Sequence, residues 1–250
     1  MTHPRFVFVI PYRDRQHHKQ FFDVYIKYLL EDMNESEYEI LFVHQTDKRP
    51  FNCGAMKNIG FLYIKEKYKE TYKDITFIFN DVDTLPYQKN LLKYDTVYGE
   101  VKHFYGYEFA LGGIVSIKGG DFEKINGYPN YWGYGFEDNI LYKRAKEVYK
   151  INRDQFYTIN SNEILQFYDG IKKIMDKNNL NNQFNKSYIE QDGLSKLSNV
   201  QYLFKNNMLQ VITFEGLYNS DNFQSYAHSL FNGSKIVKKD NRFVKMEMYR

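Results

Sequence analysis

The sequence is poor in cysteine, tryptophan and proline, with one, one and five of these residues among 250. The single cysteine, Cys53, excludes an intramolecular disulfide and with it the small secreted folds that disulfides stabilise. Apolar runs such as residues 6–10 are short, whereas a membrane-spanning helix needs about eighteen apolar residues and a secretory leader also needs a longer run. We therefore expect a cytoplasmic protein, in the host cytoplasm if it is viral, or a domain separated from a membrane anchor.

Basic and acidic residues nearly balance, with 34 Lys and Arg against 31 Asp and Glu and a net charge of +3. This is too close to neutrality for a protein that coats nucleic acid, so we expect no nucleic-acid partner. Aromatic residues make up 18% of the chain, which excludes disorder over most of its length. The sequence has no Walker loop, no paired C-x-x-C and no G-x-S-x-G element, which argues against P-loop hydrolysis, zinc ribbons and α/β-hydrolase chemistry.

Strand and helix patterns alternate over the first ninety residues. Continuous apolar runs predict strands, and a period near 3.6 predicts the helices between them. Strands with apolar residues on both faces are typical of a parallel sheet covered on both sides, so the fold class is α/β. The predicted strands are 6–10, 39–43 and 75–79, and the predicted helices are 17–30 and 54–68.

Polar clusters follow each of these strands, at 12–15, 44–47 and 81–83. In parallel sheets the ligand site lies outside the carboxyl ends of the strands. Asp81 and Asp83 are two positions apart, so both carboxylates face one cation if the strand geometry persists. The alternative is that both acids begin a surface turn.

Two further groups of residues have side chains of types suited to ligand binding or catalysis. Arg13 and Arg15 have paired donors suited to phosphates or uracil carbonyls, although an ion pair with Asp14 is the simpler interpretation. Residues 132–138, WGYGFED, combine aromatic rings, glycines and acids. Aromatic rings can stack on sugars, and a carboxylate can remove the proton of a hydroxyl group. The alternative is that the two acids only complement the dipole at the N-terminus of a helix.

Taken together, these segments resemble the β-1,4-galactosyltransferase family of inverting glycosyltransferases. The resemblance spans about residues 5–215, with the elements in the family's order. Residues 8–15 resemble its P-[FY]-R-[ND]-R element, 51–61 its F-N-R-[AG] helix start, and 79–86 its D-V-D segment. Residues 112–116 and 125–138 resemble the block from G-G-V-S to W-G-W-G-x-E-D-D, and 192–194 a later D-G-L.

The resemblance implies a GT-A (Rossmann-like) fold, a mostly parallel twisted sheet flanked by helices in a single catalytic domain. We place that domain at residues 1–215 and a C-terminal extension of unknown role at 216–250. The implied reaction moves a hexose or N-acetylhexosamine (Gal, GalNAc or GlcNAc) from a UDP-sugar to a sugar hydroxyl of a glycan or glycoprotein, with inversion.

By the same resemblance, Asp138 is the general base and Glu137 binds sugar hydroxyls. Mn²⁺ is the implied cofactor, with Mg²⁺ as the alternative, and Asp83 and Glu163 are its candidate ligands. The implied donor-binding residues are Arg13, Arg15, Phe51, Asp81, Asp83, Gly113 and Tyr134, and the acceptor-binding residues are Trp132, Tyr134, Glu137 and Asp138.

Three departures from the family pattern matter. The family completes its metal site with M-x-x-H or H-x-H, but residues 162–169 contain neither Met nor His, and Glu163 and Gln166 are the nearest oxygen ligands. The family's Arg after F-N is Cys53 here. Ala110 stands where many members have Tyr, which leaves room for an N-acetyl group on the donor.

Two alternative functions remain open at this point. One is a catalytically silent sugar- or nucleotide-binding module, which the four acids Asp81, Asp83, Glu137 and Asp138 argue against. The other is a metal-dependent phosphoryl-transfer enzyme, which leaves the 132–138 block unexplained.

Overall fold

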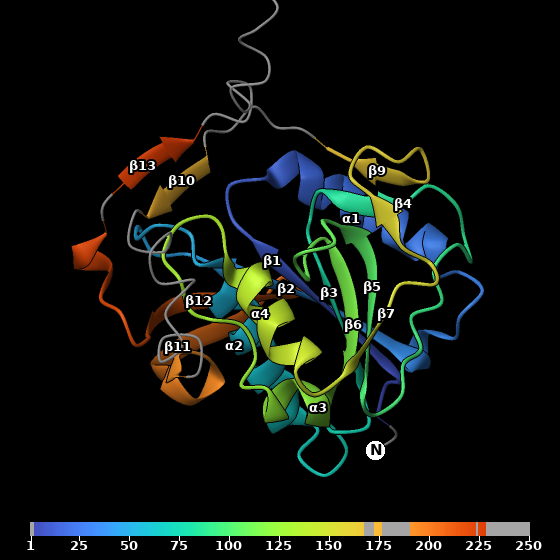
Figure 1. Ribbon diagram of the computed structural model, residues 1–250, viewed down its shortest axis with the longest axis horizontal. Helices are drawn as coiled ribbons and strands as arrows, with labels where there is room; N and C mark the ends of the chain where they lie inside the picture. Colours follow the sequence, from blue (N-terminus) through green and yellow to red (C-terminus); the bar gives the residue numbers. More distant parts are fainter. Residues whose placement is uncertain (1–2, 168–172, 177–190, 224, 229–250) are drawn as a thin grey trace, which may run out of the picture.

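The computed structural model describes residues 3–167, 173–176, 191–223 and 225–228, and its centre is a nine-stranded mixed sheet (Figure 1). The strand order is β11-β12-β2-β1-β3-β6-β5-β7, with β8 paired to β5. Most of the predicted extension, residues 229–250, lies outside the described residues. The sheet strands are β1 (Phe6–Tyr12), β2 (Tyr38–Gln45), β3 (Thr76–Asn80), β5 (Glu100–Gly106), β6 (Ile114–Lys118), β7 (Lys150–Asn152), β8 (Tyr157–Thr158), β11 (Ser198–Lys205) and β12 (Met208–Glu215).

The middle of the sheet is parallel, as the sequence predicts. Strand β1 pairs in parallel with β2 on one side and β3 on the other, and β12 pairs in parallel with β2. Strand β6 then runs antiparallel between β3 and β5. The α/β prediction is therefore confirmed, and the polar segments after β1, β2 and β3 lie at one edge of the sheet.

Helices cover both faces of the sheet. Strand β1 is buried on both sides, with Val7 and Val9 facing one apolar cluster and Phe6 and Phe8 the other. Helix α1 packs in the second cluster, whereas α2, α3 and α4 pack in the first. The helices are α1 (Gln16–Leu29), α2 (Cys53–Lys67), α3 (Gly119–Lys124) and α4 (Glu137–Lys146), with short 3₁₀ turns at Glu35–Glu37, Leu194–Lys196 and Ser220–Asn222.

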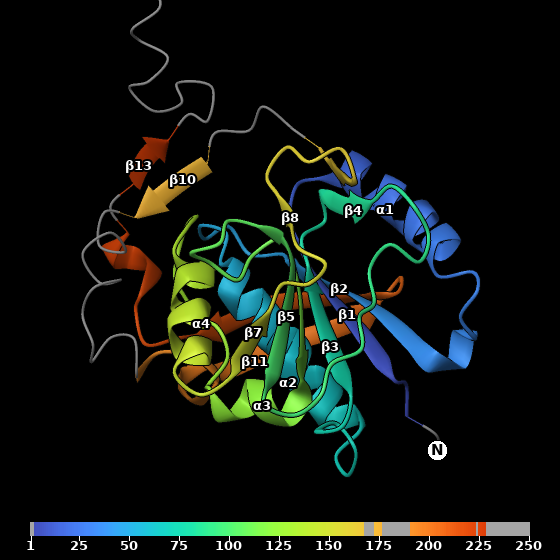
Figure 2. The ribbon, with the colours of Figure 1, turned by 45° about the vertical axis from the view of Figure 1, so that its right-hand side comes forward.

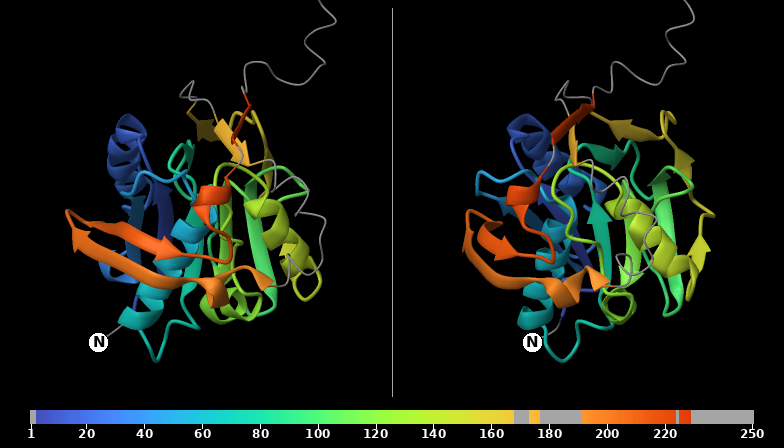
Figure 3. Two further views of the ribbon diagram at one scale, coloured as in Figure 1. Left: turned by 90° about the vertical axis from the view of Figure 1, so that its left-hand side faces the viewer. Right: turned by 60° about the vertical axis from the view of Figure 1, so that its left-hand side comes forward.

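Two small ribbons lie outside the main sheet (Figure 2). One pairs β4 (Thr84–Pro86) with β9 (Ile164–Gln166), and the other pairs β10 (Lys173–Asp176) with β13 (Ser225–His228). The β11–β12 hairpin forms an edge of the main sheet and is orange in Figure 3. The predicted boundary at 215 stays a prediction, although Trp132 Nε1 donates to the carbonyl of Tyr218, 2.8 Å away. Within the described part of the chain, no helix has the length and apolarity to cross a bilayer.

Helix α2 lies very close to the sheet. The side chain of Asn52 caps its first turn by accepting a hydrogen bond from the amide of Ala55, 2.9 Å away. At Gly60, a Cβ atom would lie 2.6 Å from Val9 Cγ1 and 2.8 Å from Val43 Cγ2. Glycine is therefore what allows the helix axis to approach the strands this closely.

We expect Gly60→Ala to destabilise the protein. The added methyl group overlaps two buried valines, and such overpacking costs about 1–3 kcal/mol, more than the better helix propensity of alanine returns. Urea unfolding measures the change. Gly120→Ala is the matched control, because its Cβ would meet Tyr98 and Lys73 side-chain atoms no closer than 3.2 Å. Equal stability of the two variants would contradict the argument.

Candidate active site

Four chain segments meet beyond the carboxyl end of β3. They are the start of α2, the turn after β3, the two glycines before β6 and the start of α4. Backbone hydrogen bonds join them: the amide of Asp81 donates to the carbonyl of Gly113 (2.9 Å), and the amide of Leu111 donates to the carbonyl of Asp138 (3.0 Å). The sequence therefore brings Asp81, Gly113 and Asp138 together, as the resemblance implies.

A buried lysine occupies the centre of this meeting point. The side chain of Lys57 is 2% exposed, and its Nζ lies 3.2 Å from Asp138 Oδ1 and 3.5 Å from Asp81 Oδ1. The same ammonium lies over the ring of Tyr128, 4.6 Å from its centroid. Lys57 is not among the site residues that the sequence predicts. A signal was present, because this lysine lies among the apolar and small residues of 54–61 in α2.

Asp138 has the electrostatics of a general base. Burial raises its pKa to about 7, the neighbouring carboxylates of Glu137 and Asp81 add to the rise, and the ammonium of Lys57 opposes it. A carboxylate with a pKa near neutrality is well matched to accepting a proton at physiological pH. Its side chain keeps 25% of its exposure, so a ligand can reach it.

Gly112 leaves space for the carboxylate of Asp138, and Gly113 leaves space for the strand that contains Tyr105. A Cβ at Gly112 would lie 2.4 Å from Asp138 Oδ2. Gly113 has φ +67°, and a Cβ there would lie 2.5 Å from the carbonyl oxygen of Tyr105. Any larger residue at either position therefore displaces the carboxylate or the strand beside it.

The segment before α4 has an unusual backbone. Gly133, Gly135 and Phe136 all have positive φ, at 82°, 105° and 73°. This conformation suits glycine but is strained for phenylalanine, and such strain is concentrated at functional sites. The amide of Gly133 donates to the carbonyl of Phe51, 3.0 Å away, which ties the segment to the start of α2.

The aromatic residues of this segment differ in their accessibility. Tyr134 is 42% exposed, and its pKa is raised by desolvation and then by the charges of Glu137, Asp138, Asp81 and Asp83. Trp132 is only 4% exposed and stacks on Phe214, with centroids 5.1 Å apart. The predicted contact of Trp132 with an acceptor stays a prediction, while packing explains the indole.

Asp81 and Asp83 pair with different basic side chains. Strand β3 ends at Asn80, and the amide of Thr84 donates to the carbonyl of Asp81 across a turn (3.1 Å). The condition for both carboxylates to face one cation is therefore not met. Asp83 Oδ2 accepts from Arg15 Nη1 at 2.8 Å, whereas Asp81 faces Lys57.

The two arginines after β1 lie on the same edge of the sheet. Arg15 and Asp83 are joined across 68 residues of sequence, and both are mostly buried. Arg13 donates through Nε to Asp14 (3.3 Å) and through Nη1 to the carbonyl of Arg49. The ion pair with Asp14 that the sequence left open is thus present, and the carbonyl of Arg49 holds the other branch of the guanidinium.

A buried polar network holds the segment before α4 against α2. The amide and Nδ2 of Asn130 donate to the two carboxylate oxygens of Asp192, at 2.7 and 2.8 Å. Asn58 Nδ2 donates to Asn130 Oδ1 at 3.0 Å, and Asn52 Nδ2 donates to the carbonyl of Asn130 at 3.0 Å. Apart from the D-G-L resemblance at 192–194, this network leaves no local pattern in the sequence, because its members are far apart in the chain.

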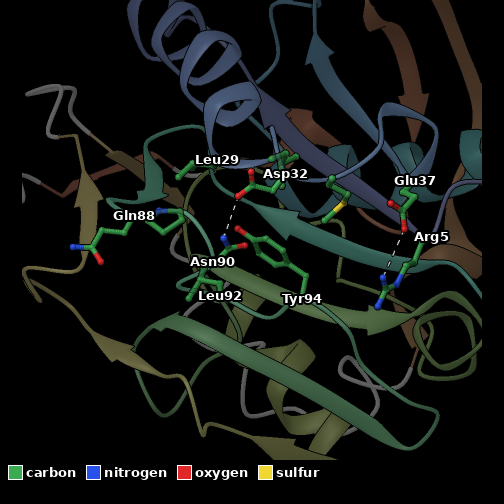
Figure 4. A pocket seen from close by; sticks show the side chains of 11 residues that line it. Arg5, Leu29, Asp32, Glu37, Gln88, Asn90, Leu92 and Tyr94 are labelled. Carbon is green, nitrogen blue, oxygen red and sulfur yellow. Dashed lines mark hydrogen bonds and ion pairs between the residues drawn. The ribbon is translucent and has the colours of Figure 1, made fainter.

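A cavity of 240 Å³ lies at the other end of β1 (Figure 4). Arg5 precedes β1 and lines the cavity, whereas Arg13 and Arg15 follow the same strand. Asn90 Nδ2 donates to Asp32 Oδ2 across it, 3.2 Å away. The cavity is therefore separate from the place where the four chain segments meet.

Two family models match consecutive parts of the chain. The N-terminal region of glycosyl transferase group 7 matches residues 1–95, and the N-terminal domain of galactosyltransferase matches residues 94–164. The chain belongs to the β-1,4-galactosyltransferase family. The matched regions contain both arginines, the D-V-D turn, the two glycines and the start of α4.

Relatives agree with this assignment, and solved structures share the fold. The xylosylprotein 4-beta-galactosyltransferase of Caenorhabditis elegans is 29% identical over 83% of this chain and 73% of its own length. Beta-1,4-galactosyltransferase 4 of Cricetulus griseus is 33% identical over 59% of this chain, which spans 44% of that relative. The catalytic domain of Drosophila β1,4-galactosyltransferase 7, solved with xylobiose, has a TM-score of 0.69 at 21% identity, over 84% of this chain and 94% of that one.

The fold of this galactosyltransferase family member is therefore the GT-A fold that the resemblance implies. A mutant of the same Drosophila enzyme, solved with manganese, UDP-Gal and xylobiose, has a TM-score of 0.61 at 20% identity, over 84% of this chain and 94% of that one. The chain spans less than half the length of the vertebrate relatives that it matches, 38% for the galactosyltransferase 2 and 44% for the galactosyltransferase 4 of Cricetulus griseus.

The residues that the resemblance implies as metal ligands lie in or next to the β4–β9 ribbon. Gln166 faces Thr84, and the amide of Phe167 donates to the carbonyl of Asp83 at 2.8 Å. Glu163 is exposed and its carbonyl accepts from Tyr87, at the far end of the ribbon from Asp83. Gln166, rather than Glu163, therefore lies beside Asp83. In the described part of the chain, no group of three or more His, Cys, Asp or Glu side chains is placed to hold a metal.

We expect Asp138→Asn to change how stability depends on pH. The folded-state pKa of Asp138, about 7, lies above the ordinary value of 3.8, so the folded protein binds this proton more tightly than the unfolded chain. The wild type therefore loses stability relative to the variant as pH rises from about 4 to 7, by on the order of 2–4 kcal/mol. Urea unfolding across this range measures the difference. The exposed Asp154→Asn is the control, and a constant difference across the range for Asp138→Asn would contradict the raised pKa.

Proposed function

We propose that the protein transfers a hexose or N-acetylhexosamine from a UDP-sugar to a sugar hydroxyl of a glycan or glycoprotein, with inversion at the anomeric carbon. The observation that carries the proposal is the carboxylate of Asp138, with its pKa raised to about 7, beside the turn that contains Asp81 and Asp83. Family membership supports the reaction, and the Drosophila relative was solved with UDP-Gal and xylobiose.

The acceptor side of the reaction is assigned to the start of α4. Asp138 takes the proton of the acceptor hydroxyl, while that oxygen forms a bond to the anomeric carbon of the donor and the bond from this carbon to UDP breaks. The pair of electrons of the broken bond leaves on the diphosphate. Glu137, which is 6% exposed beside Asp138, is positioned to orient sugar hydroxyls. Tyr134 precedes these acids in the chain and is exposed enough to stack on a sugar ring.

The donor side is assigned to the segments after β1 and β3. Arg13 and Arg15 present guanidinium groups at the carboxyl edge of the sheet, where they suit the diphosphate and the uracil carbonyls. Phe51 is half-buried next to this edge and suits the uridine. The backbone of Gly113 holds Asp81 in place through the 2.9 Å hydrogen bond.

Mn²⁺, or Mg²⁺, is the cofactor that we propose. Asp83 offers a carboxylate and the adjacent Gln166 offers an amide oxygen, both of which are suitable ligands for these hard cations, and substrate phosphates usually complete such a site. When bound, the metal neutralises charge on the leaving diphosphate, which is worth several kcal/mol of transition-state stabilisation. Gln166 Oε1 accepts from the hydroxyl of Tyr105 at 2.6 Å, which orients the amide.

A catalytically silent binding module is the second candidate. Replacement of the family's Met and His ligands by residues 162–169, together with the absence of a three-ligand cluster among the described side chains, favours it. The two candidates differ in turnover rather than in UDP binding.

The first experiment combines binding and transfer. UDP, UDP-Gal, UDP-GalNAc, UDP-GlcNAc and UDP-Glc are each tested by thermal shift with Mn²⁺, Mg²⁺ or EDTA, and then in a transfer assay with xylobiose and other saccharides. A ligand at a hundred times its dissociation constant adds about 2.7 kcal/mol, which is a clear shift. For Asp138→Asn we expect the UDP shift to persist, and transfer to fall by about a hundredfold to ten-thousandfold because the base is lost.

Each other outcome has a defined meaning. A UDP shift in the wild type without transfer of any donor would establish the binding module instead. Parallel loss of UDP binding and transfer in Asp138→Asn would remove Asp138 from the role of base. A shift that persists in EDTA would remove the metal from donor binding.

Donor choice gives a second test of the site. Ala110 is buried beside Leu111, just before the two glycines, where many family members have Tyr. We expect an N-acetylhexosamine donor in the wild type, and we expect Ala110→Tyr to shift the ratio of kcat/KM toward UDP-Gal by about tenfold to a hundredfold, because the ring fills the space for the N-acetyl group. Ala110→Gly keeps that space and is the control. An unchanged donor ratio in Ala110→Tyr would contradict this role.

A further inference from the structure

Lys57 is the feature of the site that the proposed reaction does not yet use. Its ammonium joins two acids from different segments, Asp81 from the turn after β3 and Asp138 from α4. Under the proposed function, these two acids belong to the donor side and the acceptor side. A single buried cation therefore connects the two halves of the site.

Burying an ammonium group costs several kcal/mol unless nearby charges compensate. Burial alone lowers the pKa of Lys57, but the carboxylates of Asp138 and Asp81 more than offset it, so the lysine remains charged. The charge is fixed in position as well, because α2 is capped by Asn52 and packed tightly against β1 and β2 at Gly60. The lysine is thus a rigid positive charge 3.2 Å from the candidate base.

The position of Lys57 on α2 explains another feature of the sequence. Residue 53 is a cysteine where the family element F-N-R-[AG] has arginine. Cys53 and Lys57 are four positions apart and so lie on the same side of the helix. The thiol of Cys53 is near the same charges, with its pKa raised by burial and lowered by Lys57. Lys57 therefore supplies positive charge one turn along the helix from the position where this chain lacks it.

We propose that Lys57 is a positioning residue for the base: it holds the Oδ1 atom of Asp138 in place and favours the ionised form of that carboxylate. The proposal rests on the proposed function for its consequence in catalysis, but not for the electrostatics themselves. Removing the ammonium leaves the carboxylate among acids and a buried tyrosine, which favours its protonated form. The titratable groups that face Asp138 are Lys57, Asp81, Glu137, Cys53, Tyr128 and Tyr134.

The test measures the ionisation of Asp138 directly. The carboxyl carbons of aspartate are labelled with ¹³C, the signal of Asp138 is assigned from its absence in Asp138→Asn, and the pKa is read from an NMR titration. We expect Lys57→Met to raise that pKa by one to three pH units, the usual effect of one adjacent charge. The acid limb of the pH profile of kcat/KM moves by the same amount, and Lys57→Arg restores both values.

Two further variants complete the design. Lys65→Met removes an ion-paired lysine from the same helix, 2.5 Å from Glu123, and should leave the titration and the pH profile unchanged. Lys57→Gln removes the charge but keeps hydrogen-bond donors, so it serves if Lys57→Met does not fold. Lys57→Gln should also raise the pKa of Asp138.

An unchanged pKa of Asp138 in folded Lys57→Met or Lys57→Gln would overturn the proposal, as would a loss of rate without a shift of the acid limb. Failure of the proposed function is recognised separately. In that case the wild type transfers no sugar from any UDP donor, while the NMR titration still reports whether Lys57 controls Asp138.

Discussion

The site depends on one ion-pair cluster in which the ammonium of Lys57 lies between the carboxylates of Asp138 and Asp81. Charges of one sign repel strongly at low dielectric, so Asp81, Glu137 and Asp138 need a cation to share a largely buried space. Lys57 and Gly60 lie within one turn of α2, and Gly60 lets this helix approach the sheet closely. The packing of α2 against the sheet and the electrostatics of the site are therefore linked, because the position of α2 sets the position of the Lys57 ammonium.

The apolar patterns of the sequence predicted most of this framework. Continuous runs at 6–10, 39–43 and 75–79 became β1, β2 and β3, because a strand buried on both faces leaves a signal that is local in the chain. The same reasoning placed polar clusters at one edge of the sheet. Motif order then brought the start of α4 to that edge, and the backbone hydrogen bond between Leu111 and Asp138 agrees with it.

What the sequence did not show depends on contacts between distant residues or on a local change of direction. The end of β3 at Asn80 turns Asp81 and Asp83 toward different cations, and no periodicity reveals where a strand stops. The strand register of the β4–β9 ribbon decides that Gln166, not Glu163, lies beside Asp83. Lys57 was missed because a lysine within a helix is usually solvated. Its burial follows only from the position of α2 between the sheet and α4.

A transferase of this kind has to hold an anionic diphosphate and an ionised base in one site without letting them repel each other. Under the proposed function, these tasks fall to different elements: guanidinium groups come from the segment after β1, while Glu137 and Asp138 come from the start of α4. Lys57, on a third element, contacts Asp138 and Asp81. Because α2 is packed tightly against the sheet, the charge of Lys57 does not have to reorganise during the proposed reaction, in which negative charge moves from the base to the leaving group. A preorganised charge of this sort is worth more than a mobile one, since no reorganisation is needed at the moment of reaction.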